Sequence, residues 1–192
     1  SKHRLFLDMD GVIVDYDKFA ADNWIPLDKV KHHPRAYLEM EPMPGALDAI
    51  KQLLATELYE IWIATKPPTG NAQAYADKAT WIFKHLPELK RNIIITHDKG
   101  LLGDKHDILV DDRVHKANCV QFKGKLLHFG PQFGWADVLH TLMPKKNNLV
   151  EIDKDLALID KIAQQALQRV SLTTDPTDPA LAKGNDLTPR PQ

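Results

Sequence analysis

Asp8-Met9-Asp10-Gly11-Val12 follows directly on the apolar run Leu5-Phe6-Leu7. Such a run is typical of a short buried strand, so two carboxylates stand where this strand ends. In an open α/β sheet a strand end faces the crevice where ligands bind, and Gly11 turns the chain away without a Cβ. Two ionised carboxylates in one crevice repel each other unless a hard divalent cation joins them. The segment therefore predicts a magnesium-assisted phosphoryl-transfer site, although Asp-x-Asp-Gly also occurs in calcium loops and in plain turns.

Three later segments repeat this placement of polar residues just beyond an apolar run. In chain order they supply a hydroxyl and an ammonium at Thr65 and Lys66, a further ammonium at Lys99, and a second acidic pair at Asp111 and Asp112. The order acid, hydroxyl, lysine, acid specifies a metal site, a phosphate cradle and a nucleophile together. The alternative is four solvated strand ends with no common purpose.

Strands and helices alternate along the chain, which implies a parallel sheet with right-handed crossovers. Pro44 and Gly45 open an amphipathic helix, and a second helix is predicted from about Asn71 to His85. Further along, the patterns predict short strands at 119–122 and 126–129 and a helix from Trp135 to Met143. The sequence thus predicts an α/β fold.

The four motifs and their order resemble the haloacid dehalogenase superfamily of aspartate-nucleophile phosphatases. More narrowly, the chain is similar to the 5'(3')-deoxyribonucleotidases over about residues 4 to 143. The segments that carry the narrower resemblance are Asp8–Val12, Glu41–Ala49, Thr96–Lys99 and Ile108–Arg113. The resemblance implies a three-layer Rossmann-like core with a central parallel sheet and a small helical cap inserted after the first strand.

The domain organisation expected from this resemblance is a catalytic core of residues 1–16 and 42–143, with the cap insert at 17–41. A C-terminal helical extension is predicted at 144–171 and a flexible, proline-containing tail at 172–192. The extension carries an apolar stripe at alternating intervals of four and three, formed by Ile152, Leu156, Ile159, Ala163, Ala166 and Val170. Packing of this stripe on the parent domain is the default expectation, and pairing between two subunits is the alternative.

The resemblance also implies roles for single residues. Asp8 would attack phosphorus and become an aspartyl phosphate, while Asp10 would protonate the leaving oxygen and later deprotonate water. Thr65, Lys66 and Lys99 would bind the phosphate. Mg²⁺ would be held by Asp8, by the Asp10 carbonyl and by Asp112, with Asp111 as an outer partner of a water or of Lys99.

Three departures from the family pattern leave alternatives open. The interval from Lys99 to Asp111 is two residues longer than in the family, so Lys105 is a possible substitute for Lys99. Lys66 stands where the nucleotidases usually carry serine, and either binds phosphate or points to solvent. The cap is short, which leaves the choice of base in doubt.

Aromatic residues of the cap are the candidates for base recognition. Tyr16 matches an aromatic of the family's base pocket, and Phe19, Trp24 and Tyr37 are further candidates. The helical spacing of Tyr16, Phe19 and Trp24 is equally typical of side chains that only pack the cap onto the core.

The composition fits a single-domain enzyme of 192 residues, 43% of them hydrophobic, with a formal net charge of −1. This balance of charge disfavours a nucleic-acid polymer as partner, while a nucleoside monophosphate remains a fitting substrate. A single cysteine, Cys119, and the lack of a secretion signal or a membrane-spanning stretch indicate a cytoplasmic protein. We expect a monomer or a homodimer.

These observations favour a magnesium-dependent phosphomonoesterase for nucleoside or deoxynucleoside monophosphates. One alternative is a phosphatase for another small phosphate ester, such as a sugar phosphate. An alternative of another class is a non-catalytic nucleotide-binding protein, which would need no nucleophile and proton donor side by side.

Overall fold

The computed structural model describes residues 2–145 and 149–173. The predicted flexible tail, 172–192, lies outside the described residues except for its first two, which are helical. Among the helices described, none has both the length and the apolar character needed to cross a bilayer.

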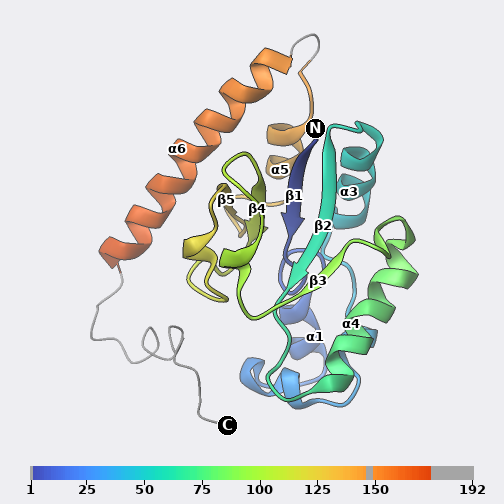
Figure 1. Ribbon diagram of the computed structural model, residues 1–192. Coiled ribbons are helices and arrows are strands. Elements are labelled where there is room, and N and C mark those ends of the chain that lie inside the picture. Colours follow the sequence, from blue (N-terminus) through green and yellow to red (C-terminus); the bar gives the residue numbers. More distant parts are fainter. Residues whose placement is uncertain (1, 146–148, 174–192) are drawn as a thin grey trace.

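A five-stranded parallel sheet forms the centre of the fold, in the order β3-β2-β1-β4-β5 (Figure 1). The strands are β1 (His3–Leu7), β2 (Tyr59–Thr65), β3 (Ile93–Ile95), β4 (Ile108–Asp111) and β5 (Lys125–His128). Leu7 pairs with Ile63 of β2 and with Val110 of β4, so the carboxyl ends of the three central strands meet at one edge. The α/β prediction is confirmed.

One face of the sheet packs against two helices, α3 (Ala46–Ala55) and α5 (Trp135–Leu142), with the main hydrophobic core between them. Alternate strand residues such as Leu5 and Leu7 point into this core, as the period of a strand requires. A further helix, α4 (Ala72–His85), follows β2, and a short 3₁₀ turn, η2 (Pro87–Leu89), leads to β3. The helix predicted from Asn71 is confirmed, because the Asn71 side chain accepts a hydrogen bond from the Ala74 amide and caps α4.

The other face of the sheet carries two short 3₁₀ turns, η3 (Lys99–Leu101) and η4 (Cys119–Gln121). The strand predicted at 119–122 is therefore wrong. Cys119 and Phe122 are buried while the two residues between them are exposed, which is a spacing of three and not of two. Asn118 adopts a left-handed conformation, and the Phe122 amide donates to the Cys119 carbonyl, so this backbone bonds locally and joins no ladder.

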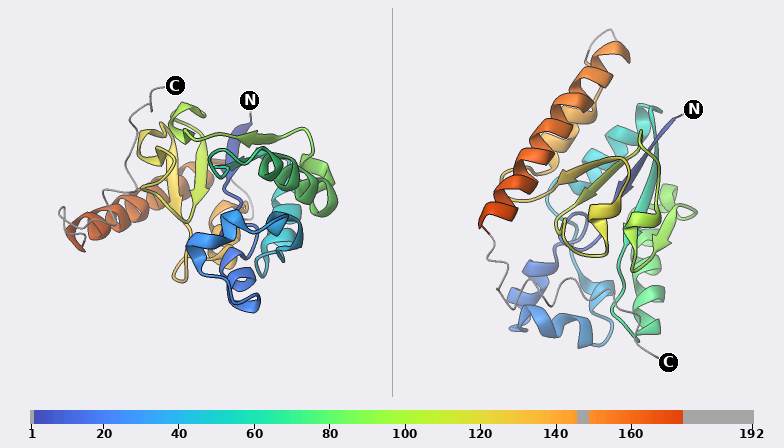
Figure 2. Two further views of the ribbon diagram at one scale, coloured as in Figure 1. Left: turned by 90° about the horizontal axis from the view of Figure 1, so that it is seen from below. Right: turned by 60° about the vertical axis from the view of Figure 1, so that its left-hand side comes forward.

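The cap contains three short helical elements, α1 (Tyr16–Asp22), η1 (Leu27–His32) and α2 (Ala36–Glu39), joined by turns. An antiparallel bridge between Val14 and Pro42 joins the segments that enter and leave it. Two contacts tie the cap to α4: the Arg35 guanidinium donates to the Asp77 carboxylate, and the Trp81 indole donates to the Met40 carbonyl. Figures 1 and 2 show the cap at the carboxyl ends of the strands.

The last helix, α6 (Leu149–Thr173), runs beside β5 and α5 (Figure 1). Leu156, Ile159 and Ala163 of the predicted stripe are buried, and Lys125 of β5 forms an ion pair with Asp160 at 2.8 Å. Packing of the extension on the parent domain is thus confirmed for these residues.

We expect Ile159→Ala to lower the free energy of unfolding by about 2–4 kcal/mol, because the side chain is 5% exposed and leaves a cavity. Ile162→Ala, on the exposed face of the same helix, serves as control and should change it by less than about 1 kcal/mol. Urea unfolding at two protein concentrations measures both. A loss of stability that depends on protein concentration would favour subunit pairing through this helix instead.

Candidate active site

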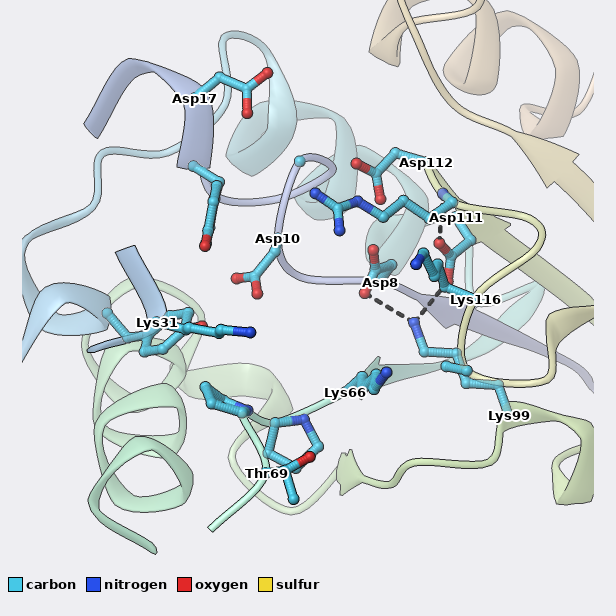
Figure 3. A pocket seen from close by; sticks show the side chains of 17 residues that line it. Asp8, Asp10, Asp17, Lys31, Lys66, Thr69, Lys99, Asp111, Asp112 and Lys116 are labelled. Atoms are coloured by element: carbon cyan, nitrogen blue, oxygen red, sulfur yellow. Dashed lines mark hydrogen bonds and ion pairs between the residues drawn. The ribbon is translucent and has the colours of Figure 1, made fainter. Parts of the chain in front are cut away.

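A buried lysine joins two carboxylates at the ends of neighbouring strands. The Lys99 ammonium lies 2.8 Å from an Asp8 oxygen and 2.6 Å from an Asp111 oxygen (Figure 3). All three side chains are buried, because Asp8 follows β1 and Asp111 ends β4, its neighbour in the sheet. The structure thus brings together three of the predicted residues and places Asp8 on the wall of a cavity.

Lys99, and not Lys105, is the lysine of this site. Lys105 is exposed in the polar turn before β4, whereas Lys99 begins η3. The turn that carries Lys99 is held by Asp98, whose carboxylate accepts hydrogen bonds from the Gly100 amide and from the Asn118 side chain. The interval between Lys99 and Asp111, which is longer than in the family, contains η3 and the turn that follows it.

Asp8, Asp111 and Asp112 form a carboxylate cluster whose nearest oxygens all lie within 4.8 Å of one another. Gly11 is part of the same arrangement, because a Cβ built there would lie 2.2 Å from an Asp112 oxygen. The donors are all carboxylate oxygens, which is the donor set that hard divalent cations prefer. The residues present therefore fit a Mg²⁺ site.

Asp111 makes contacts within the protein through both of its carboxylate oxygens. One of its carboxylate oxygens contacts Lys99, and the other accepts a hydrogen bond from the Arg113 amide. The Cys119 thiol lies 3.5 Å from the same oxygen as Lys99. Both carboxylate oxygens of Asp111 therefore already have partners within the protein.

Asp10 has a partner that sequence reasoning missed. The Lys78 ammonium, from α4, donates to an Asp10 carboxylate oxygen at 3.0 Å and to the Thr65 hydroxyl at 2.8 Å. Lys78 is 0% exposed, and its ammonium lies 4.3 Å from the centre of the Tyr37 ring. The other Asp10 oxygen is buried without a hydrogen-bond partner among the described residues. Lys78 therefore sets the position of Asp10.

A signal for Lys78 is present in the sequence. The buried face of α4 comprises Ala74, Asp77, Lys78, Trp81 and Ile82, so two charged residues occupy positions of the apolar stripe. Charged side chains at such positions need partners, because burying an unpaired charge is costly. Asp77 pairs with Arg35 of the cap, and Lys78 pairs with Asp10 of the site.

The two acidic residues of the first motif differ in their electrostatic surroundings. Burial opposes ionisation of Asp8, but the Lys99 ammonium, a hydrogen bond with Asp112 and the charge of Lys78 together lower the pKa of Asp8. Burial raises the pKa of Asp10 in spite of Lys78. Burial and the neighbouring Asp8 charge raise the pKa of Asp111 to about 6 and of Asp112 to about 9. A cation bound among these carboxylates would lower their pKa values again.

A cavity of about 350 Å³ opens above these groups. Of the predicted phosphate ligands, Lys66 and Lys99 line it, whereas the Thr65 hydroxyl faces Lys78 and Thr65 is only 1% exposed. Lys31 and Lys116 also line the cavity, from the cap and from the segment after β4 (Figure 3). Sequence reasoning did not select these two lysines, since neither lies at a strand end.

The aromatic residues that are candidates for base recognition differ in whether they line the cavity. Tyr16 and Tyr37 line the cavity, and the Tyr16 hydroxyl donates to the Leu27 carbonyl at 3.1 Å. Phe19 is buried in the core. Trp24 is 94% exposed, adopts a positive φ of 56° and does not line the cavity.

Comparisons with known proteins relate this chain to nucleotidases. Residues 27–160 match the family model described as 5' nucleotidase, deoxy (pyrimidine), cytosolic type C protein. The human cytosolic 5'(3')-deoxyribonucleotidase is 28% identical over an alignment of 144 residues, and the match covers 57% of this chain and 70% of that protein. The human mitochondrial 5'(3')-deoxyribonucleotidase is 24% identical over 143 residues, covering 57% of this chain and 62% of that protein.

A solved structure from Burkholderia xenovorans LB400, named as a haloacid dehalogenase-like hydrolase, matches with a TM-score of 0.41 and 15% identity. That match covers 67% of this chain and 82% of the other. The span that the family model matches contains Thr65, Lys99 and Asp112, and it begins after Asp8. The chain belongs to the family described as 5' nucleotidase, deoxy (pyrimidine), cytosolic type C protein.

We expect Gly11→Ala to weaken divalent-cation binding about tenfold or more, because the new Cβ would displace the Asp112 carboxylate. Gly70→Ala is the matched control, since Gly70 has a φ of +76° against +78° at Gly11 but nothing within 4 Å of a built Cβ. In both variants the new alanine adopts a positive φ, which lowers the free energy of unfolding by about 1 kcal/mol. Titration with Mn²⁺ as a paramagnetic probe measures the affinity, and equal affinity in the two variants would remove Asp112 from the site.

Proposed function

We propose that this protein is a magnesium-dependent phosphomonoesterase that hydrolyses nucleoside and deoxynucleoside monophosphates through an aspartyl-phosphate intermediate. The observation that carries the proposal is the position of the Asp8 carboxylate, which lines the cavity while Lys99 contacts one of its oxygens at 2.8 Å. Asp10, on the same loop, lines the same cavity. A nucleophile beside a proton donor has a purpose in catalysis and none in simple binding.

In the first step an Asp8 oxygen forms a bond to phosphorus while the ester P–O bond breaks, and Asp10 gives its proton to the leaving alkoxide. In the second step water attacks phosphorus, Asp10 accepts a proton from that water, and the Asp8–phosphorus bond breaks to release inorganic phosphate. Lys99 offsets negative charge on the transferred group and on Asp8 in both steps. Lys78 holds Asp10 toward the reacting oxygen.

Asp8 and Asp112, together with the Asp10 carbonyl, are the residues that would hold Mg²⁺. The ion would supply positive charge beside the phosphoryl oxygens and keep the Asp8 carboxylate ionised. Asp111 would act from outside the ligand set, since its oxygens already bind Lys99 and the Arg113 amide.

A nucleotide substrate is supported by the relatives, which are named as 5'(3')-deoxyribonucleotidases. Tyr16 is the residue that we assign to base contact, because it lines the cavity from the cap. A cytoplasmic location is supported by Cys119, which is buried and is the one cysteine of the chain.

The proposal is tested by phosphate release from ribo- and deoxyribonucleoside 5'- and 3'-monophosphates and from sugar phosphates, with Mg²⁺ and with EDTA. We expect Mg²⁺-dependent release from nucleotides and at least a thousandfold loss in Asp8→Asn, several kcal/mol at about 1.4 kcal/mol per tenfold. Asp28→Asn, an exposed carboxylate of the cap, is the control and should retain turnover. Full turnover in Asp8→Asn would refute the nucleophile, and release only from sugar phosphates would refute the substrate.

Lys78→Met should lower kcat for nucleotides by about tenfold to hundredfold, because Asp10 loses the contact that orients it. The loss should be much smaller with 4-nitrophenyl phosphate, whose leaving group needs no proton. Lys84→Met, exposed on the same helix, is the control. Equal losses with both substrates would show that Lys78 has a structural role and does not position the acid.

A further inference from the structure

The outer part of the cavity is lined by several cations, while the lining as a whole also holds five aspartates. Four cations line it there, and we call them the outer cation cluster: Lys31, Lys66, Arg113 and Lys116. No ion pair within residues 2–145 and 149–173 involves any of the four. The inner lysines differ, since Lys78 and Lys99 are both paired with carboxylates.

The members of the cluster come from different elements that converge on the same space. Lys31 belongs to η1 of the cap, Lys66 follows β2, and Lys116 follows β4. In the view of Figure 3, Lys31 lies on one side of Asp10, and Lys66 and Lys116 lie on the other. Burial together with the charges of Lys116 and Arg113 lowers the pKa of Lys66, so these cations are close enough to repel one another. An anion between them would relieve that repulsion.

Seven of the seventeen residues that line the cavity are uncharged. Tyr16 and Tyr37 are the aromatic residues among those that line it, and Lys78 already occupies the face of Tyr37. Asp17 is the carboxylate of the lining that comes from the cap. A cavity of about 350 Å³ with these walls has room for a compact ligand and recognises it more through charge than through stacking.

We propose that the preferred substrate is a bisphosphate: a phosphomonoester that carries a second phosphate, which the outer cation cluster binds while the first phosphate meets Asp8. The inference rests on the proposed phosphatase chemistry and concerns which phosphate ester that chemistry acts on best. Its chemistry is shared by nucleoside 3',5'-bisphosphates and by sugar bisphosphates. As in the two-step hydrolysis above, water and one phosphate ester of the substrate give inorganic phosphate and an alcohol, and this alcohol retains the second phosphate.

The test compares KM for a 2'-deoxynucleoside 3',5'-bisphosphate with KM for the 5'-monophosphate of the same base, and likewise for a sugar bisphosphate and its monophosphate. We expect KM for at least one bisphosphate to be about tenfold or more below that of its monophosphate, the worth of one charge-assisted hydrogen bond. The pair that shows the difference identifies the source of the second phosphate. Raising the ionic strength from about 0.05 M to 0.5 M should reduce the difference between the two KM values, because the outer cation cluster is largely exposed and salt screens its charges.

Lys31→Met and Lys116→Met should each bring the ratio of KM values to within about threefold. Lys29→Met, an exposed lysine of η1 that does not line the cavity, is the matched control and should keep the wild-type ratio. Mg²⁺-dependent turnover with equal KM for mono- and bisphosphates would overturn this inference and leave the proposed function standing. No phosphate release from any of these esters would overturn the proposed function and this inference with it.

Discussion

The contact of Lys99 with Asp8 and Asp111 is the interaction on which the rest of the site depends. Parallel pairing of Leu7 with Val110 places the residues that follow β1 and end β4 side by side, so their carboxylates meet in a buried position. Two such charges would repel each other strongly without a cation. The Lys99 ammonium lies within 2.8 Å of both, and although burial opposes its charge, the two carboxylates raise its pKa. A buried lysine is tolerable here because it is fully paired.

That ammonium can reach both carboxylates because of the way its turn is attached. The Lys99 amide donates to the Ala117 carbonyl, and Asp98 accepts from Asn118, so η3 is fastened to the segment that follows β4. The same segment begins at Asp112, directly after Asp111 at the end of β4. Lys99 and the acidic cluster are consequently held as one unit, and a displacement of η3 would move the charge that offsets Asp8. On the other side, the Trp135 indole donates to the Val12 carbonyl at 2.6 Å and fixes the loop of Asp8 and Asp10.

The sequence predicts those parts of the site that depend on strand ends. Asp8, Lys99 and Asp111 each follow or end an apolar run, and parallel pairing brings such ends together whatever the details of packing. Lys78 was not predicted because it lies in the middle of a helix and its partner Asp10 is 68 residues away in the chain. Its one signal in the sequence is its position on the buried, otherwise largely apolar face of α4. The error at 119–122 has a related cause, because a short segment with apolar residues at 119, 120 and 122 fits a strand or a 3₁₀ turn that covers the sheet.

The charged residues of the cavity fall into a buried inner group and a more exposed outer group. We assign the cleavage of the phosphate ester to the inner group and the choice of substrate to the outer group. Inner charges are buried and paired, so replacing Lys78 or Lys99 would leave a carboxylate without its partner and cost stability as well as activity. Outer cations are exposed or half-buried and unpaired within the described residues, so replacing Lys31 or Lys116 leaves no buried charge behind. Substitution at the outer positions can therefore change which ester enters without disturbing how its phosphate is cleaved. The short cap fits this division, because it contributes Lys31 and Tyr16 to the cavity wall and none of the paired inner charges.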